Sequence, residues 1–287
     1  MLFNAVKPAP ETFNFKVVME DQKSTIVYGI NPILEAMDAG KRRCYKIHIK
    51  EGKLNARIQS ILKLAAAAGV KVETLPKQLF QQKYGAYAHQ SIIGHFSSIA
   101  AMEINDLVRR AFAETAHPAL VLADEIQDPQ NLGAMIRSAE VLGIQGLILP
   151  ERRSAPLNEA VAKCSAGAVE RLPLASVPNL ANAVEFLKQA GFWIVGVEAG
   201  GKTPCHEFQF DLPVALIIGG EEKGIRPLLR KKCDFTLSIP MEGKLNSLNA
   251  AAASAVVFYE ILRQKKERKK LAGPTTENAH KKSGEKL

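Results

Sequence analysis

Three segments of the sequence carry polar side chains at the ends of apolar runs. These side chains are Asn131, Arg137, Glu221, Ser247 and Asn249. An arginine can hold a phosphate group through two parallel hydrogen bonds, and amide, hydroxyl and carboxylate groups can orient a substrate beside it. Each residue taken alone also has a structural explanation that needs no substrate. Arg137 could close a surface ion pair, and Ser247 could be a helix N-cap. Asn249 is harder to explain this way, since a helix start needs one cap.

A glycine pair precedes Glu221. The apolar run VALIIG, residues 214–219, ends at Gly219, and Gly220 follows directly. Glycine lets a ligand touch the backbone, although a simple turn is the commoner reason for such a pair. Taken alone, the glycine pair fits either a ligand site or a turn.

A second glycine-rich segment imitates a nucleotide-binding motif. GVEAGGKT, residues 196–203, satisfies the pattern G-x-x-x-x-G-K-[ST] and predicts a nucleoside triphosphatase if taken alone. That loop binds phosphate only when its Lys and Thr open a helix with free amides. Here Pro204 and the run CHEFQFDLP follow directly, which leaves no room for that helix. We predict a glycine-rich loop at a strand end.

Apolar strands and helical patterns alternate along most of the chain. A first unit, residues 24–99, combines short strands and helices into a small α/β domain, after a loose leader over residues 1–23. Residues 100–118 form a linker or an extra helix. Residues 119–264 resume with longer strands, which suit a mainly parallel sheet covered on both faces. In such sheets ligands bind beyond the carboxyl ends of the strands, where the polar residues lie.

Composition narrows the class of protein. The chain has 287 residues, 47% of them hydrophobic, without the roughly 18 consecutive apolar residues of a membrane span or the order of a signal peptide, so we expect a cytoplasmic protein. Its four scattered cysteines suggest neither disulfides nor a metal site. The net charge is +9, of which +6 lies in residues 263–287. We expect residues 265–287 to form a disordered basic tail that either aids solubility or contacts nucleic acid.

Together the three polar segments resemble the SpoU-type RNA ribose methyltransferases, a group of trefoil-knotted α/β proteins. NLGAMIRSA is similar to the first motif of that family, IIGGEEKG to the second, and IPMEGKLNSLNAAAA to the third, in the same order over about 140 residues. The amino-terminal unit, from VYGINPILEAM to HQSIIGHF, resembles the ribosomal-protein-L30-like substrate-binding domain of large-subunit rRNA members. Two departures are Ser91, where His-Gln-Gly is usual, and the pair Glu222-Lys223 inside the second motif.

The resemblance implies a fold and a reaction. It implies a knotted carboxyl-terminal domain that binds S-adenosylmethionine and transfers its methyl group to a ribose 2'-hydroxyl of RNA, most directly a guanosine of 23S rRNA. It also implies a homodimer that shares each active site, and we place its contact on the helix face of Gly133 and Ala134. By the same resemblance, Asn131, Arg137, Glu221, Ser247 and Asn249 are the catalytic residues. The residues at the cofactor are Gly196, Gly219, Gly220, Ile239, Met241 and Leu248.

Other functions stay open at this point. A tRNA 2'-O-methyltransferase carries the same motifs, and a non-catalytic rRNA-binding assembly factor could keep the same fold. The cytosolic nucleoside triphosphatase built on residues 196–203 is a third alternative. Arginine rarely releases its proton in proteins, so phosphate positioning suits Arg137 better than the role of general base.

Overall fold

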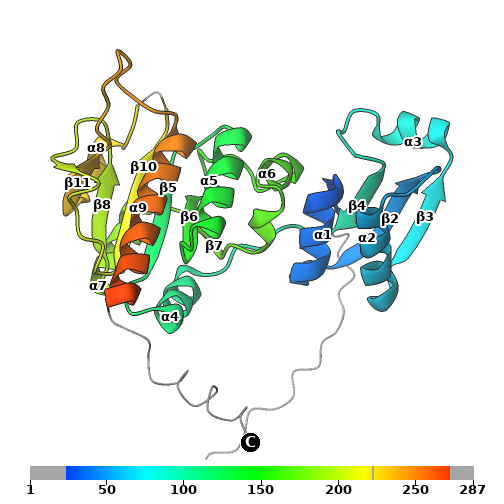
Figure 1. Ribbon diagram of the computed structural model, residues 1–287, viewed down its shortest axis with the longest axis horizontal. Helices are drawn as coiled ribbons and strands as arrows, with labels where there is room; N and C mark the ends of the chain where they lie inside the picture. The colour runs from blue at the N-terminus through cyan, green and yellow to red at the C-terminus, as the bar shows by residue number, and fades with distance from the viewer. Residues whose placement is uncertain (1–23, 222, 272–287) are drawn as a thin grey trace, which may run out of the picture.

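The computed structural model describes residues 24–221 and 223–271, which form two α/β domains (Figure 1). The amino-terminal domain is built on a four-stranded mixed sheet of order β1-β4-β2-β3. Its strands are β1 (Thr25–Tyr28), β2 (Cys44–Lys50), β3 (Lys71–Leu75) and β4 (Ile92–Phe96). β4 runs antiparallel to β1 and β2, whereas β2 and β3 are parallel. The predicted small α/β domain is therefore present.

Three helices complete this domain: α1 (Ile30–Ala39), α2 (Ala56–Ala67) and α3 (Lys77–Tyr84). Local sequence explains their ends. The Asn55 side chain accepts a hydrogen bond from the Ile58 backbone N–H and so caps α2, and Gly40 ends α1 in a left-handed conformation that glycine adopts without strain. Ile33, Ile47 and Ile61 lie fully buried between the sheet and these helices.

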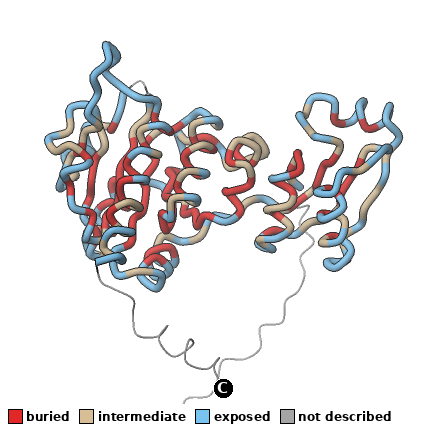
Figure 2. The backbone as a smooth tube through the Cα atoms, viewed as in Figure 1, coloured by how far each residue is buried: buried red, intermediate tan, exposed pale blue. Residues whose placement is uncertain are grey.

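The second domain contains a seven-stranded sheet of order β7-β6-β5-β10-β8-β11-β9, in which every pair is parallel. The strands are β5 (Ala119–Asp124), β6 (Gly146–Pro150), β7 (Leu174–Val177), β8 (Trp193–Val197), β9 (Thr203–Pro204), β10 (Val214–Gly219) and β11 (Phe235–Ser238). The central strands β5, β6 and β10 are buried along almost their whole length (Figure 2). Continuous burial explains their unbroken apolar runs.

Helices cover both faces of this sheet. One face packs against α5 (Pro129–Val141), α6 (Glu159–Cys164), the short 3-10 helix η1 (Ala168–Glu170) and α9 (Ala250–Leu271). The other packs against α4 (Ile104–Glu114), α7 (Leu180–Gln189) and α8 (Pro227–Lys232). Neighbouring residues of β5 point to opposite cores, since Val121 joins the first cluster and Leu122 the second.

The structure decides between two interpretations of one segment and corrects the prediction for another. Residues 100–118 hold the extra helix, because α4 packs on the second domain with Leu107 fully buried. The last helix continues to Leu271, so residues 265–271 are helical and do not belong to a disordered tail. The leader, 1–23, and the tail from 272 onward lie outside the described residues. The elements that sequence reasoning missed are all short, namely α6, β7, β9 and α8.

The trefoil knot stays a prediction of the resemblance, because strand order and register do not report how loops thread. In the described part of the chain, no helix has the length and apolar character needed to cross a membrane. All four cysteines are free, and only Cys205 is buried.

A buried ion pair joins the two domains. Arg42 Nη1, in the segment before β2, lies 2.8 Å from Glu170 Oε1 in η1, and their side chains are only 3% and 2% exposed. Around it, Arg171 bonds to Glu35 and Asp38 of α1. Burial raises the pKa of Glu170, while Arg42 acts in the opposite direction.

Candidate functional site

The polar residues singled out in the sequence come from loops at the carboxyl edge of the second sheet. β5, β8, β10 and β11 all end at this edge because they are parallel. The helices α5 and α9 begin there and pack against each other. Their first turns therefore bring the amino-terminal and carboxyl-terminal parts of the domain to one place.

Asn131, Glu221 and Asn249 form a hydrogen-bonded cluster. Asn131 Nδ2 donates to Glu221 Oε1 at 2.7 Å, and Asn249 Nδ2 donates to Asn131 Oδ1 at 2.8 Å. Asn249 Nδ2 also donates to Glu221 Oε1. Three residues separated by up to 118 positions are thus held in one network, which fixes the Glu221 carboxylate against two amide donors.

Asn249 is also the cap of α9. Its Oδ1 accepts hydrogen bonds from the backbone N–H groups of Ala251, at 2.9 Å, and Ala252, at 3.3 Å. The sequence interpretation assigned the cap to Ser247, and that assignment is wrong, because the helix begins three residues later at Ala250. Ser247 is instead an exposed residue that lines a cavity.

The larger of two cavities beside this cluster has a volume of about 320 Å³. Its wall combines strand-end backbone, aliphatic side chains and the Glu198 carboxylate. Of the predicted cofactor residues, Gly219, Gly220, Ile239, Met241 and Leu248 line it, with Ser247 and Glu221 on the same wall. A largely apolar cleft of this size, with few polar groups, is typical of small-molecule sites. The residues present therefore fit a nucleoside-type ligand.

Gly196 is the one predicted cofactor residue that does not line this cavity. It lies inside β8, where a Cβ atom would stand 3.0 Å from Cys233 Sγ and 3.0 Å from Ile225 Cδ1. From this strand, the cavity wall is formed by Val197, with Glu198 and Ala199 following it. Sequence reasoning missed Glu198 because it tested this segment only as a phosphate loop or a glycine-rich loop.

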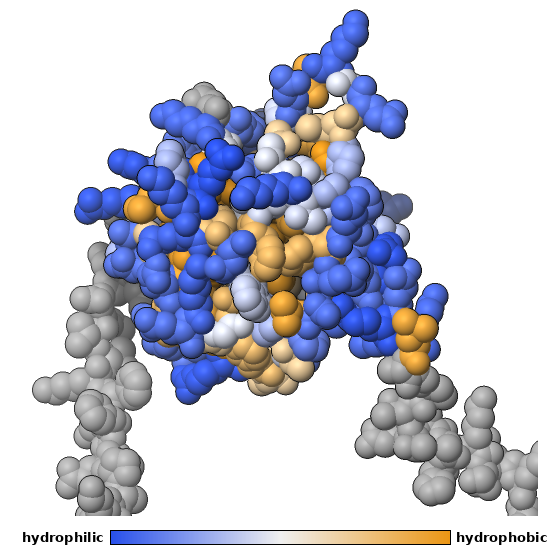
Figure 3. Space-filling view, turned by 90° about the vertical axis from the view of Figure 1, so that its left-hand side faces the viewer, coloured by the Kyte–Doolittle hydropathy of each residue, from blue (hydrophilic) through white to orange (hydrophobic). Residues whose placement is uncertain are grey.

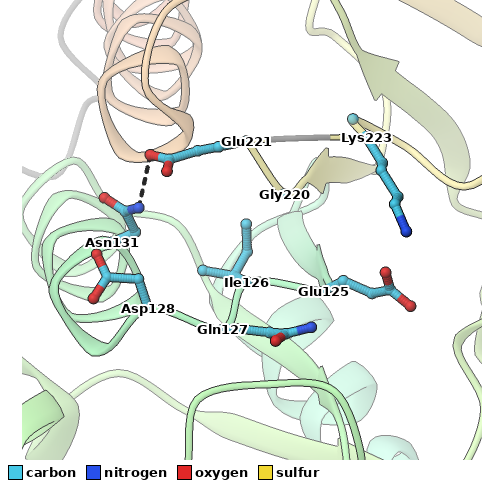
Figure 4. A pocket seen from close by; sticks show the side chains of 9 residues that line it. Glu125, Ile126, Gln127, Asp128, Asn131, Gly220, Glu221 and Lys223 are labelled. Atoms are coloured by element: carbon cyan, nitrogen blue, oxygen red, sulfur yellow. Dashed lines mark hydrogen bonds between the residues drawn. The ribbon is translucent and has the colours of Figure 1, made fainter.

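A second cavity, of about 270 Å³, lies on the other side of Gly220 and Glu221 (Figure 4). Figure 4 shows Asn131 and Glu221 joined at one end, while Glu125 and Lys223 line the cavity away from this pair. Glu125 adopts a left-handed backbone conformation, with φ of 59°, which is uncommon for a residue other than glycine. Glu221 therefore lines both cavities, which lie on either side of its loop.

Arg137 lies apart from the cluster. It is exposed on α5 and lines neither cavity. Within residues 24–221 and 223–271 it has no hydrogen-bond or ion-pair partner. The surface ion pair considered for it is therefore absent from the described chain. Six residues separate it from Asn131, which places the two side chains on different sides of the helix.

Gly133 does not lie on an outward face of α5. A Cβ atom at this position would lie 2.5 Å from Cys164 Cβ and 2.9 Å from the Ser165 backbone nitrogen. The glycine allows α5 to pack closely on α6 in the same chain. The expectation that Gly133 supplies a contact between subunits is therefore wrong, whereas Ala134 is partly exposed.

The phosphate-loop alternative finds no support in this geometry. Thr203 and Pro204 form β9, which pairs with β11. No helix opens at Lys202, so the amides that cradle phosphate in such loops are not presented. Among the described residues, no three His, Cys, Asp or Glu side chains are grouped to hold a metal ion.

Comparison with known proteins decides the family. Residues 118–259 match the model of the SpoU rRNA Methylase family, and residues 26–100 match that of the RNA 2'-O ribose methyltransferase substrate-binding domain. A TrmH family tRNA/rRNA methyltransferase of Bacillus subtilis, YacO, is 34% identical over 244 residues, covering 85% of this chain and 97% of that protein. The chain belongs to the SpoU/TrmH family of RNA methyltransferases.

Solved structures of this family share the fold. The SpoU methyltransferase AviRb of Streptomyces viridochromogenes superimposes with a TM-score of 0.73 at 25% identity, over 85% of this chain and 91% of that one. Its complex with the cofactor AdoMet gives a TM-score of 0.70 at 27% identity, over 84% and 90%. The predicted α/β fold, S-adenosylmethionine as cofactor and RNA methyltransferase activity are thereby confirmed.

Proposed function

We propose that this SpoU/TrmH methyltransferase methylates a ribose 2'-hydroxyl of RNA, and that its target is a guanosine of 23S rRNA. The observation that carries the proposal is the cluster of Asn131, Glu221 and Asn249 between two cavities. One cavity suits the methyl donor and the other is open to a nucleotide. The amino-terminal domain, which matches a ribose methyltransferase substrate-binding model, supports RNA as the substrate.

Bound S-adenosylmethionine supplies an electrophilic methyl group on its sulfonium. The protein then has to align the 2'-hydroxyl with that methyl group, and alignment alone can supply much of the acceleration. Glu221, held by Asn131 and Asn249, is placed to accept a hydrogen bond from the hydroxyl. Ser247 lines the donor cavity close in sequence to Asn249 and can orient the same ribose.

Arg137 holds the phosphate next to the target ribose in this proposal, and it does so in the partner's active site. On α5 it lies between the outward residues Ala134 and Val141, spaced at helical intervals. On the adjacent α9, Val256 and Tyr259 are also exposed. Exposed apolar side chains on two adjacent helices, together with a guanidinium that has no partner in the described residues, suit a two-fold contact in which each arginine reaches across.

Mixing two inactive variants tests the shared site. Arg137→Ala and Glu221→Gln homodimers should each be inactive. If each site takes Arg137 from one subunit and Glu221 from the other, a mixed dimer regains one intact site, and an equal mixture should recover about a quarter of wild-type activity. No recovery after verified subunit exchange would mean that both residues act within one subunit.

Substitution of Arg137 tests the mechanism. Arg137→Ala should abolish methyl transfer while S-adenosylmethionine binding persists, because the residue lines neither cavity. Arg137→Lys should keep the charge and lose most turnover, since a point charge cannot reproduce the planar bidentate fork. A substrate with a 2'-deoxyribose at the target should accept no methyl group. Methylation of the deoxy substrate would show base methylation instead.

The choice of RNA is testable in cells. The B. subtilis relative carries both tRNA and rRNA in its name, so tRNA is the second candidate. Mapping 2'-O-methyl positions in rRNA and tRNA from cells lacking this protein should reveal one missing guanosine mark in 23S rRNA. A missing tRNA mark would favour the alternative, and no missing mark would favour a non-catalytic assembly factor. We further propose that the protein acts in the cytoplasm, where its RNA substrates are made.

A further inference from the structure

Glu198 is a carboxylate in the wall of the methyl-donor cavity that none of the family motifs includes. It directly follows β8, and its backbone N–H donates to the Leu237 carbonyl oxygen at 2.9 Å, which fixes the residue against β11. Its side chain is 15% exposed and lines the cavity together with Gly219 and Gly224. The backbone therefore holds a charged group at the donor site.

The carboxylate lacks a hydrogen-bond donor. Its Oε1 atom is buried, and no donor in the described ranges hydrogen-bonds to it. Arg230 Nε lies 3.0 Å from the same atom and forms an ion pair, but the alignment is not that of a hydrogen bond. Oε1 is closed to solvent beside Arg230, whereas the side chain as a whole is 15% exposed, so its exposed surface belongs to its other atoms. A ligand that brings hydroxyl donors into the cavity that Glu198 lines would find an acceptor with unused hydrogen-bonding capacity.

Two parts of the methyl donor carry donors that a carboxylate accepts: the ribose diol and the α-ammonium group. Arg230 already balances the charge of Glu198, so the attraction for a further cation is reduced. A neutral hydroxyl needs only a free lone pair, which the partly exposed carboxylate retains. In another nucleotide-binding α/β fold, an acidic residue likewise binds ribose hydroxyls beside a glycine-rich loop.

We propose that Glu198 binds the ribose hydroxyl groups of S-adenosylmethionine and selects ribonucleosides over deoxyribonucleosides in the donor cavity. The assignment rests on the cofactor of the family and not on the choice of target RNA. It also gives the loop at residues 196–203 a role that the phosphate-loop pattern does not explain. Arg230 orients the carboxylate through the ion pair, and it lies outside the donor cavity.

The test is calorimetric binding of S-adenosylhomocysteine, which carries no transferable methyl group, to the full-length protein. Glu198→Ala should lower affinity about 10-fold, equivalent to about 1.4 kcal/mol, and Glu198→Gln should lower it less because one carbonyl oxygen remains. Glu207→Ala is the matched control, since Glu207 is 62% exposed and lines neither cavity. Its affinity should equal that of the wild type.

Ligand analogues separate the possible partners of the carboxylate. 5'-Methylthioadenosine lacks the ammonium group, and its affinity should fall by the same factor in Glu198→Ala. Its 2',3'-dideoxy form should bind wild type and Glu198→Ala equally, a comparison that also reports on folding of the variant. A loss confined to S-adenosylhomocysteine would assign Glu198 to the ammonium and overturn the proposal. Unchanged affinities in both Glu198 variants would overturn it as well. Failure of rRNA methylation with these binding results intact would reject only the proposed target.

Discussion

Asp124 at the end of β5 binds Arg226 in the loop after β10 through both carboxylate oxygens. Oδ1 accepts from Arg226 Nε at 2.6 Å, and Oδ2 accepts from the Arg226 backbone N–H at 2.9 Å. Asp124 is fully buried, whereas the arginine side chain is partly exposed. The loop that carries Glu221 is thus anchored to the neighbouring strand by a side chain that touches neither cavity.

Replacing Asp124 should weaken cofactor binding although Asp124 does not line the donor cavity. Asp124→Asn removes the charge and places an amide N–H₂ near the guanidinium, so we expect the free energy of unfolding to fall by about 1–3 kcal/mol. Affinity for S-adenosylmethionine should fall several-fold, because the loop of Gly219 and Gly220 loses its fixed position. Calorimetry measures both, with the exposed Asp106→Asn as control. An unchanged affinity would show that the loop holds its shape without Asp124.

The two roles of Asn249 can be separated by substitution. Asn249→Ala removes both the cap of α9 and the donor to Glu221, so stability should fall by about 0.5–2 kcal/mol and turnover should be lost. Asn249→Asp keeps a good cap but places a carboxylate beside Glu221, so turnover should be lost while stability falls less than in Asn249→Ala. Asn179→Ala, which removes the cap of α7, should lower stability alone. An active Asn249→Asp variant would contradict the assigned role.

Acid should destabilise the amino-terminal domain through His95. Burial lowers the pKa of His95 from 6.5 to about 4, with nearby Lys46 acting in the same direction. Its ring bonds to the Tyr84 hydroxyl at 3.1 Å. Between pH 6.5 and 4, His95 is protonated in the unfolded chain but stays neutral in the folded chain. The free energy of unfolding is therefore constant above pH 6.5 with respect to this group and falls as the pH drops below it. Thermal unfolding from pH 7 to 4 measures the slope. His95→Gln should flatten it, and the exposed His206→Gln should not.

Breaking the interdomain ion pair from one side should cost more than removing it. Arg42→Met leaves Glu170 buried without its partner, and we expect a loss of about 3–5 kcal/mol. The double variant Arg42→Met/Glu170→Leu should recover most of that loss, because no unpaired charge remains. Chemical denaturation of the single and double variants measures the coupling. Equal losses in the two would mean that the pair is not the main link between the domains.

The basic carboxyl-terminal segment should add RNA affinity. Since helix α9 continues to Leu271, most of the basic charge lies on this helix, so the test that keeps the helix replaces Lys266, Lys269 and Lys270 by Gln instead of deleting residues 265–287. We expect weaker RNA binding and a flatter dependence on salt, because fewer phosphates are neutralised. Titration of rRNA fragments at several salt concentrations measures this, with S-adenosylmethionine affinity as the control. RNA affinity unchanged at low salt would assign the segment to solubility.

The local pattern of the sequence was sufficient for the longer strands and helices and for the identity of the polar residues, whereas short elements such as α6 and β7 escaped it. Buried strands such as residues 214–219 read as unbroken apolar runs because both faces of the sheet are covered. The motifs around Asn131, Glu221 and Asn249 predicted the family, and the family implied the donor. These signals are short-range, so they survive without knowledge of the fold.

Tertiary structure decided which of those residues meet. Asn131 and Asn249 are 118 positions apart, and only the packing of α5 beside α9 brings their amides to Glu221. The packing of α6 on α5 also buried Gly133 within the chain, which the spacing of small residues did not reveal. The sequence determined the chemistry that this edge of the sheet can hold. Which side chains lie close together, and which are buried, depended on long-range contacts that no local pattern encodes. Asp124 and Glu198 are held at the loops by such contacts.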